Sequence, residues 1–138
     1  MNEVLTDLKN ILKFFLFPVL IFAFSWVFLF LGLYDYFPWF DIPIHVAGGI
    51  AVGFTYFFIL KYFQDKKAIK LNPFFNTLFV ISLVALTTVL WEFYEFLLGL
   101  FTPIFTQPSL EDTLLDFFMG LSGGLFAIIF LESYFKSK

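Results

Sequence analysis

The stretch at residues 74–101, FFNTLFVISLVALTTVLWEFYEFLLGLF, decides the class of protein to which this chain belongs. At about 1.5 Å per helical residue it is long enough to cross the roughly 30 Å hydrocarbon core of a bilayer. Its two charged side chains, Glu92 and Glu95, stand three residues apart and therefore lie on one face of a helix. The stretch thus predicts a transmembrane helix that contains a pair of carboxylates.

The composition of the whole chain is that of an integral membrane protein. Of its 138 residues, 61% are hydrophobic and only 14% are charged, and the mean hydropathy is +0.92. A soluble domain has about a quarter of its residues charged. The absence of cysteine excludes disulfides and thiolate metal sites. The net charge of −3 gives no indication of a nucleic-acid partner.

Four apolar segments are long enough to span a membrane, at about residues 11–33, 42–62, 74–101 and 110–134. The breaks between them are short, which favours antiparallel neighbours. The first segment is too long for a signal peptide and no cleavage site follows it. Pro18 is expected to bend it. We therefore predict an all-α fold, in which residues 1–138 form a single transmembrane domain with the shape of a four-helix bundle.

The distribution of basic residues predicts the orientation of this bundle. Four crossings place every basic residue on the side that also holds both termini, which the positive-inside rule identifies as cytoplasmic. We therefore expect a multi-pass protein of the cytoplasmic (inner) membrane, with both termini in the cytoplasm. The opposite side carries acidic residues without any cation, so Glu92 and Glu95 have no basic partner there. The basic residues are Lys9, Lys13, Lys61, Lys66, Lys67, Lys70, Lys136 and Lys138.

A short repeat links the second and fourth predicted spans. Both follow the pattern D-x3-[HD]-x3-G-x3-G, so each places an acidic or imidazole pair and two glycines on one helical stripe. Glycines at this spacing let helix backbones approach closely. They make self-association into a homo-oligomer plausible, together with contacts to membrane lipids as the other expected partner. The positions are Asp41, His45, Gly49 and Gly53 in one span, and Asp112, Asp116, Gly120 and Gly124 in the other.

The acidic and imidazole groups of three spans are all expected in the outer half of the bundle, where one cavity could hold them. A carboxylate inside a span costs about 2.5 kcal/mol even on a lenient scale, so something must compensate it. Three compensations remain open: a bound divalent cation, protons shared with neighbouring hydroxyls, and a water-filled vestibule. Two acids also stand where they could cap helices, Asp41 before Ile42 and Asp112 in a box with Ser109.

A divalent-metal site is the leading interpretation of this constellation. Carboxylate oxygens suit Mg²⁺, Mn²⁺ or Ca²⁺, and an imidazole would admit Zn²⁺ or Fe²⁺. Asp112 is the candidate catalytic base, which would accept a proton from a metal-bound water. The candidate metal ligands are Asp41, His45, Glu92, Glu95 and Asp116.

Three motifs in chain order resemble the signatures of the YjdF-like family of small bacterial inner-membrane proteins. FDIPIHVAGG resembles its D-x3-H-x3-G motif, WEFYE its [WY]E-x2-E motif, and EDTLLDFFMG its D-x3-D motif. The likeness covers roughly residues 35–125, although this chain is shorter and has PSLED before the last motif. The resemblance implies a multi-spanning helical fold with the six acidic and imidazole residues in matching places. It implies no activity.

The sequence leaves three classes of function open. The first is a metal-dependent hydrolase or transferase acting on a lipid or a lipid-linked phosphate, in the outer half of the bundle. The second is a transporter or channel for divalent cations or protons, because acids within spans are typical of such pathways. The third is a non-catalytic membrane subunit in which the polar cluster fixes helix register.

Overall fold

A computed structural model of the chain describes residues 2–102 and 109–137, and helices make up most of that part. Three helices are long and apolar enough to cross a membrane, and α1 with α2 adds a fourth crossing when this bent pair counts as one span. The predicted all-α membrane bundle is confirmed. The elements are α1 (Asn2–Phe14), α2 (Leu16–Phe30), α3 (Leu33–Tyr36), the 3-10 turn η1 (Pro38–Phe40), α4 (Asp41–Asp65), α5 (Pro73–Phe101) and α6 (Leu110–Lys136).

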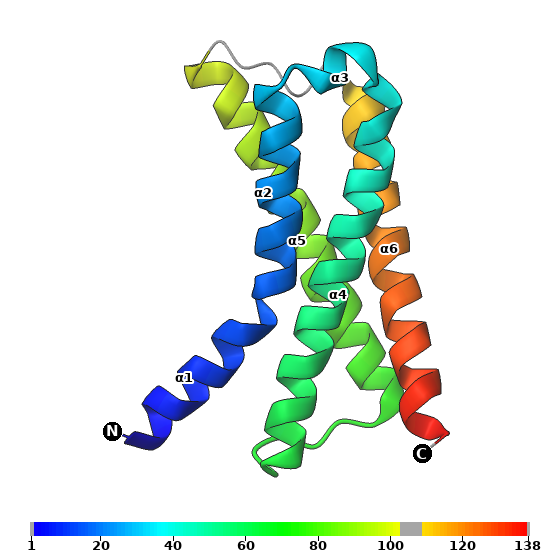
Figure 1. Cartoon of the computed structure of the whole chain (residues 1–138). Helices are drawn as coiled ribbons and strands as arrows, with labels where there is room; N and C mark the ends of the chain where they lie inside the picture. The colour runs from blue at the N-terminus through cyan, green and yellow to red at the C-terminus, as the bar shows by residue number, and fades with distance from the viewer. Residues whose placement is uncertain (1, 103–108, 138) are drawn as a thin grey trace.

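The helices alternate in direction, and the two ends of the chain lie at the same end of the bundle (Figure 1). Helices α4 and α6 run parallel and pack on each other, and α5 runs in the opposite direction and crosses behind α4 (Figure 1). The limits of these three helices agree with the predicted spans to within three residues. The side of the membrane on which the termini lie stays a prediction from the lysines. Part of the predicted break at 101–109, residues 103–108, lies outside the described residues.

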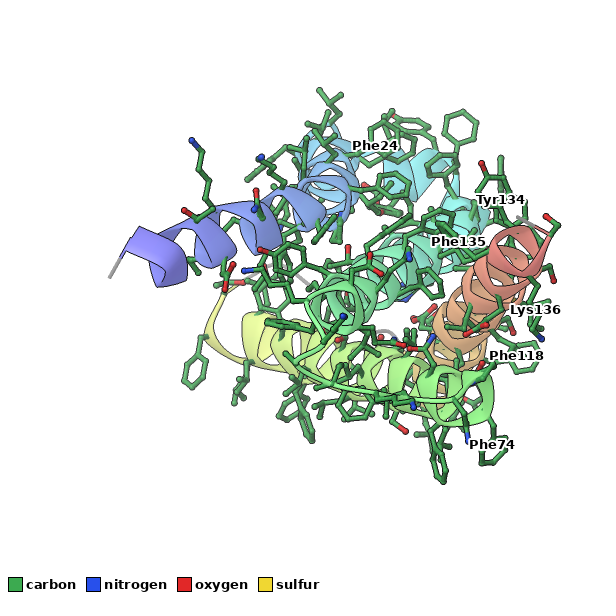
Figure 2. All side chains as sticks on the ribbon, turned by 90° about the horizontal axis from the view of Figure 1, so that it is seen from below. Phe24, Phe74, Phe118, Tyr134, Phe135 and Lys136 are labelled. Atoms are coloured by element: carbon green, nitrogen blue, oxygen red, sulfur yellow. The ribbon has the colours of Figure 1, made fainter. Side chains whose placement is uncertain are left out.

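Large apolar side chains cover the outside of the bundle, as a lipid-facing surface requires. Figure 2 looks along the helices and shows Phe24, Phe74 and Phe118 on the periphery, where they are 46%, 69% and 63% exposed. In a soluble protein, so much exposed aromatic surface would be an association site. Here it is the surface that hydrocarbon chains contact, which agrees with the membrane assignment.

The first span is predicted as one helix, but in the structure it is broken at Phe15 into α1 and α2, which meet at 44°. Pro18 lies in the first turn of α2 and has no N–H, so the carbonyl oxygen of Phe14 lacks its helical donor. The hydroxyl of Thr55 on α4 lies 2.7 Å from that oxygen and 2.9 Å from the carbonyl oxygen of Ala51 one turn back, and it donates to the closer of the two. The expected bend at Pro18 is confirmed, and Thr55 supplies the hydrogen bond that the proline removes.

Replacing Thr55 with valine should therefore weaken the junction of α1, α2 and α4. Thr55 is 3% exposed, so Thr55→Val keeps the shape but leaves the Phe14 carbonyl without this donor. We expect a loss of about 1–2 kcal/mol in the free energy of unfolding, measured by denaturant titration in detergent. Ser82→Ala is the control, because the exposed Ser82 hydroxyl bonds only one turn back, to Leu78. An equal loss in both variants would contradict a special role of Thr55.

The contact between α4 and α6 is the most extensive in the fold, and glycines make it possible. A Cβ atom on Gly49 would lie 1.9 Å from the carbonyl oxygen of Gly120, and one on Gly53 would lie 3.2 Å from the Cα of Gly124. These pairs are equivalent positions of the repeat, so the two stripes meet level by level. Self-association stays a prediction. Because these glycines already pack against each other within one chain, a homo-oligomer would have to form through other surfaces.

The half of the bundle toward the two termini, which we call the inner half, contains an apolar core below these glycines. This core is formed by side chains from α4, α5 and α6 that are at most 7% exposed. Residues near the lysine-rich end add polar ties: Tyr62 donates a hydrogen bond to Asp7 at 2.6 Å, and Lys66 forms an ion pair with the same carboxylate. The hydrogen bond that Lys66 itself donates to Asp7 raises the pKa of Lys66. The core residues are Phe57, Leu60, Val80, Val84, Ile128 and Leu131.

Candidate functional site

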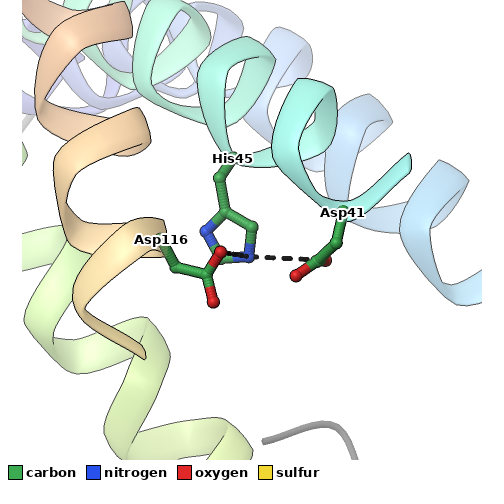
Figure 3. A group of neighbouring side chains, drawn as sticks. All are labelled: Asp41, His45 and Asp116. Carbon is green, nitrogen blue, oxygen red and sulfur yellow. Dashed lines mark ion pairs between the residues drawn. The ribbon is translucent and has the colours of Figure 1, made fainter. Parts of the chain in front are cut away.

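Three side chains from two helices meet where α4 and α6 pack near the end of the bundle away from the two termini, which we call the outer half (Figure 3). Asp41 is the first residue of α4, His45 follows one turn later, and Asp116 lies on α6. The Nε2 atom of His45 is 3.6 Å from an oxygen of Asp41 and 3.6 Å from an oxygen of Asp116. One ligand atom from each residue lies within 4.8 Å of the other two. We call these three residues the Asp–His–Asp cluster.

The cluster is largely buried and sets two carboxyl groups against one imidazole. His45 is 8% exposed and Asp116 is 2% exposed, whereas Asp41 is only partly buried. One imidazole nitrogen carries either one proton or one lone pair, so it cannot neutralise two carboxylates. Two atoms bound at about 2.1 Å to one tetrahedral ion lie about 3.4 Å apart. The two histidine–aspartate separations of 3.6 Å are close to that spacing, and all three ligand atoms lie within 4.8 Å of one another.

Neither Asp41 nor Asp112 uses its carboxylate to cap the N-terminus of its helix, so both remain available to the site. The cap position of α4 is Phe40 and no side chain caps that helix, so the capping role considered for Asp41 is wrong. Ser109 does cap α6, because its hydroxyl accepts a hydrogen bond from the backbone N–H of Asp112 at 3.1 Å. The capping therefore uses the Asp112 backbone, and Asp112 is among the residues that line the cavity described next.

A cavity of about 210 Å³ lies beside the cluster, and we call it the outer cavity. Among the described residues that line it there is no Lys or Arg. Its polar groups include Glu95, which accepts a hydrogen bond from the indole N–H of Trp91 at 2.9 Å. The volume is enough for several waters. The acidic and imidazole residues that line it are Asp41, His45, Glu95 and Asp112.

Glu92 does not line this cavity, although it is only three residues from Glu95 and interacts electrostatically with both Glu95 and Asp116. It is 4% exposed and belongs to the buried stripe of α5, at the edge of a separate groove that Ser109 and Thr113 of α6 also line. The three-residue cluster does not include it. Of the six acidic and imidazole residues singled out by sequence, the structure thus joins three in a cluster, adds two in the adjacent cavity, and places Glu92 in a neighbouring groove within electrostatic range of Glu95 and Asp116.

Sequence reasoning missed the aromatic walls of the outer cavity. Tyr34, just beyond the first predicted span, lines the cavity. The ring of His45 meets Trp91 edge-on, with 6.4 Å between ring centroids. The spacing of Trp91 four residues before Glu95 was the available signal, because it puts the indole N–H one turn from the carboxylate. The aromatic lining residues are Trp26, Tyr34, Trp91 and Tyr94.

The fold and this cluster define a class: multi-spanning α-helical membrane proteins with a buried group of carboxylates around a histidine. The chain belongs to the family described as "Predicted membrane protein (DUF2238)", whose family model matches residues 6–137. Membership in a membrane protein family is thereby confirmed, although the match does not carry the YjdF-like name, and its description names no activity. No curated protein and no solved structure matches the chain.

Proposed function

We propose that Asp41, His45 and Asp116 bind one divalent metal ion. The supporting observation is the position of the His45 Nε2 atom, 3.6 Å from one oxygen of each aspartate. An ion between these three atoms would neutralise both carboxylates and use the imidazole as a neutral ligand. The nitrogen ligand favours Zn²⁺ or Fe²⁺ over Mg²⁺ and Ca²⁺, which prefer oxygen ligands alone.

The reaction that we propose for this site is hydrolysis or group transfer on a phosphate-containing lipid. A bound divalent ion supplies a Lewis acid for a phosphoryl oxygen and lowers the pKa of a coordinated water. Asp112 lines the same cavity and is the residue that would accept the proton of that water. Trp91 holds the carboxylate of Glu95 through its indole N–H, which fixes a second acceptor beside the substrate space.

Transport of cations or protons is less well supported by the packing below the site. A pathway through the membrane needs polar groups or water along its whole length. In the described residues, an apolar layer around Val80, Val84 and Ile128, all at most 1% exposed, lies between the Asp–His–Asp cluster and a polar group nearer the two termini. That polar group is joined by hydrogen bonds and is formed by Gln64, Asn76 and Glu132. This apolar layer favours chemistry at the outer cavity over passage through the protein.

Metal analysis of the purified protein tests the proposal. We expect about one ion per chain in the wild type after purification in detergent without chelators, and less than about one tenth of that in His45→Ala, because loss of one of three protein ligands disrupts the site. Asp35→Asn is the matched control: Asp35 is an exposed carboxylate on α3, near the same end of the bundle. Wild-type protein without metal would refute the site, as would equal losses in both variants.

A further inference from the structure

A second cavity lies directly beneath the outer cavity, and its walls are almost wholly apolar. It has a volume of about 240 Å³ and is lined by residues of α2, α4, α5 and one glycine of α6, including Val19, Val52 and Val84. We call it the inner pocket. The two cavities share four lining residues: Ser25, Ile44, His45 and Trp91. The histidine of the Asp–His–Asp cluster therefore stands where a polar space passes into an apolar one.

The inner pocket lies between α2 and α5, which pack loosely against each other. Helix α2 packs along α4, whereas its backbone makes no comparable contact with α5. Side chains bridge the gap, chiefly Phe22, whose ring centroid is 5.5 Å from that of Trp91. Phe22 and Val19 line the pocket and are also 38% and 55% exposed. The α2 edge of the pocket is thus in contact with the hydrocarbon of the bilayer.

The outer cavity has the chemistry of a site for a cationic group beyond the proposed metal. Glu95 and Asp112 are carboxylates that line it but lie outside the Asp–His–Asp cluster. Aromatic faces and carboxylates together are the usual surroundings of an ammonium group, which is attracted to the ring faces as well as to the negative charges. No lysine or arginine among the described lining residues competes for these acids.

We propose that the two cavities together bind one phospholipid whose head group carries an amine. One acyl chain occupies the inner pocket, the ammonium group lies between Glu95, Asp112 and the aromatic walls, and the phosphate lies beside His45. This assignment rests on the proposed function, because the phosphate needs a metal ion among so many acids. An acyl chain of the surrounding bilayer is the occupant, since the exposed α2 edge of the pocket meets that bilayer directly.

Gly48 offers a way to close the inner pocket without disturbing the helix packing. It lines the pocket, and a Cβ atom added to it would meet nothing within 4 Å. Its neighbour Gly49 behaves oppositely, because a Cβ there would strike the backbone of α6. Gly48→Leu should therefore fill the space meant for the chain while α4 and α6 stay in contact. Ala23→Leu, at an exposed position of α2, adds the same side chain outside the pocket.

The test is photo-crosslinking in lipid nanodiscs. The probes are phosphatidylethanolamine and phosphatidylglycerol that carry a diazirine in the same acyl chain, and the labelled residues are mapped by mass spectrometry. We expect the ethanolamine probe to label pocket residues such as Val52 and Thr87 at least about fivefold more than the glycerol probe does, since about 1 kcal/mol of cation–π and charge attraction gives that ratio. Gly48→Leu should lose this labelling, and Ala23→Leu should keep it.

The same preparations separate a failure of this inference from a failure of the proposed function. Metal content is measured on each, and Gly48→Leu should retain its metal while losing the crosslinks. Equal labelling by both probes, labelling that survives Gly48→Leu, or stronger labelling by a polyprenyl phosphate probe would overturn the amine-phospholipid assignment even if metal is bound. Crosslinks of the expected pattern in a wild-type protein without metal would instead contradict the proposed metal function and the place of the phosphate beside His45, while the chain in the inner pocket and the amine contacts would stand.

Discussion

Gly49→Ala is expected to destabilise the protein by more than about 3 kcal/mol, or to prevent its folding, because the added methyl group has no space. Its Cβ would lie 1.9 Å from the carbonyl oxygen of Gly120, and that oxygen belongs to a helix backbone that cannot move alone. Overpacking of this kind usually costs about 1–3 kcal/mol when side chains can shift, and more when they cannot. The whole of α6 would have to move away from α4.

The adjacent residue provides the matched control for this prediction. Gly48→Ala adds the same methyl group to the same helix, where it meets nothing within 4 Å. We expect it to be neutral or to stabilise α4 by about 0.5–1 kcal/mol, because alanine loses less backbone freedom in a helix than glycine does. Denaturant titration followed by circular dichroism in detergent compares the two. Similar stabilities for both variants would mean that α4 and α6 do not approach as closely as the structure has them.

The helices could be predicted from sequence because a bilayer leaves the chain few choices. Every backbone polar group within the hydrocarbon must be satisfied inside the helix, so a long apolar run has one available form. This is why the limits of α4, α5 and α6 agree so closely with the apolar runs. The first span was harder to predict from sequence. Its break at Phe15 depends on Pro18 and on the hydroxyl of Thr55, which is 41 residues from the Phe14 carbonyl that it binds.

The packing partners of the glycine stripes could not be predicted in the same way. The repeat showed that Gly49 and Gly120 hold equivalent places, and close packing was expected of both. Nothing in the pattern said that they meet each other instead of a second copy. In the structure they do meet, and the level above them holds His45 and Asp116, which are also equivalent positions. The glycine contact thus sets the distance at which these two side chains face each other.

The candidate site was predictable in its helices but not in its grouping. Spacing alone put Asp41 and His45 on one face of α4, and the structure has them 3.6 Å apart. The fate of the two glutamates depends on how α5 is rotated, which its amphipathic pattern does not fix because the helix is apolar all round. Three residues correspond to about 300° of helical rotation. This is about 60° short of a full turn, so the two glutamates lie on adjacent faces of α5, where Glu95 lines the outer cavity and Glu92 lines the groove beside Thr113.

Asp116→Asn should change the stability of the protein in opposite directions with and without divalent metal. With metal at about 100 times its dissociation constant, binding stabilises the wild type by about 2.7 kcal/mol. The variant should lose most of that, because it lacks one of three ligands and the amide is a weaker one. In the presence of a chelator, the wild type holds two carboxylates around a single imidazole, which can balance only one of them.

Removing one of those buried charges should then leave Asp116→Asn at least as stable as the wild type, because an unbalanced charge away from water is costly. Thermal unfolding of both proteins, with added Zn²⁺ and with chelator, measures the two differences. Asp35→Asn should show neither effect, since that carboxylate is exposed. If the cluster instead only fixed the register of α4 and α6, the variant would be less stable by the same amount in both conditions, and the metal site would be excluded.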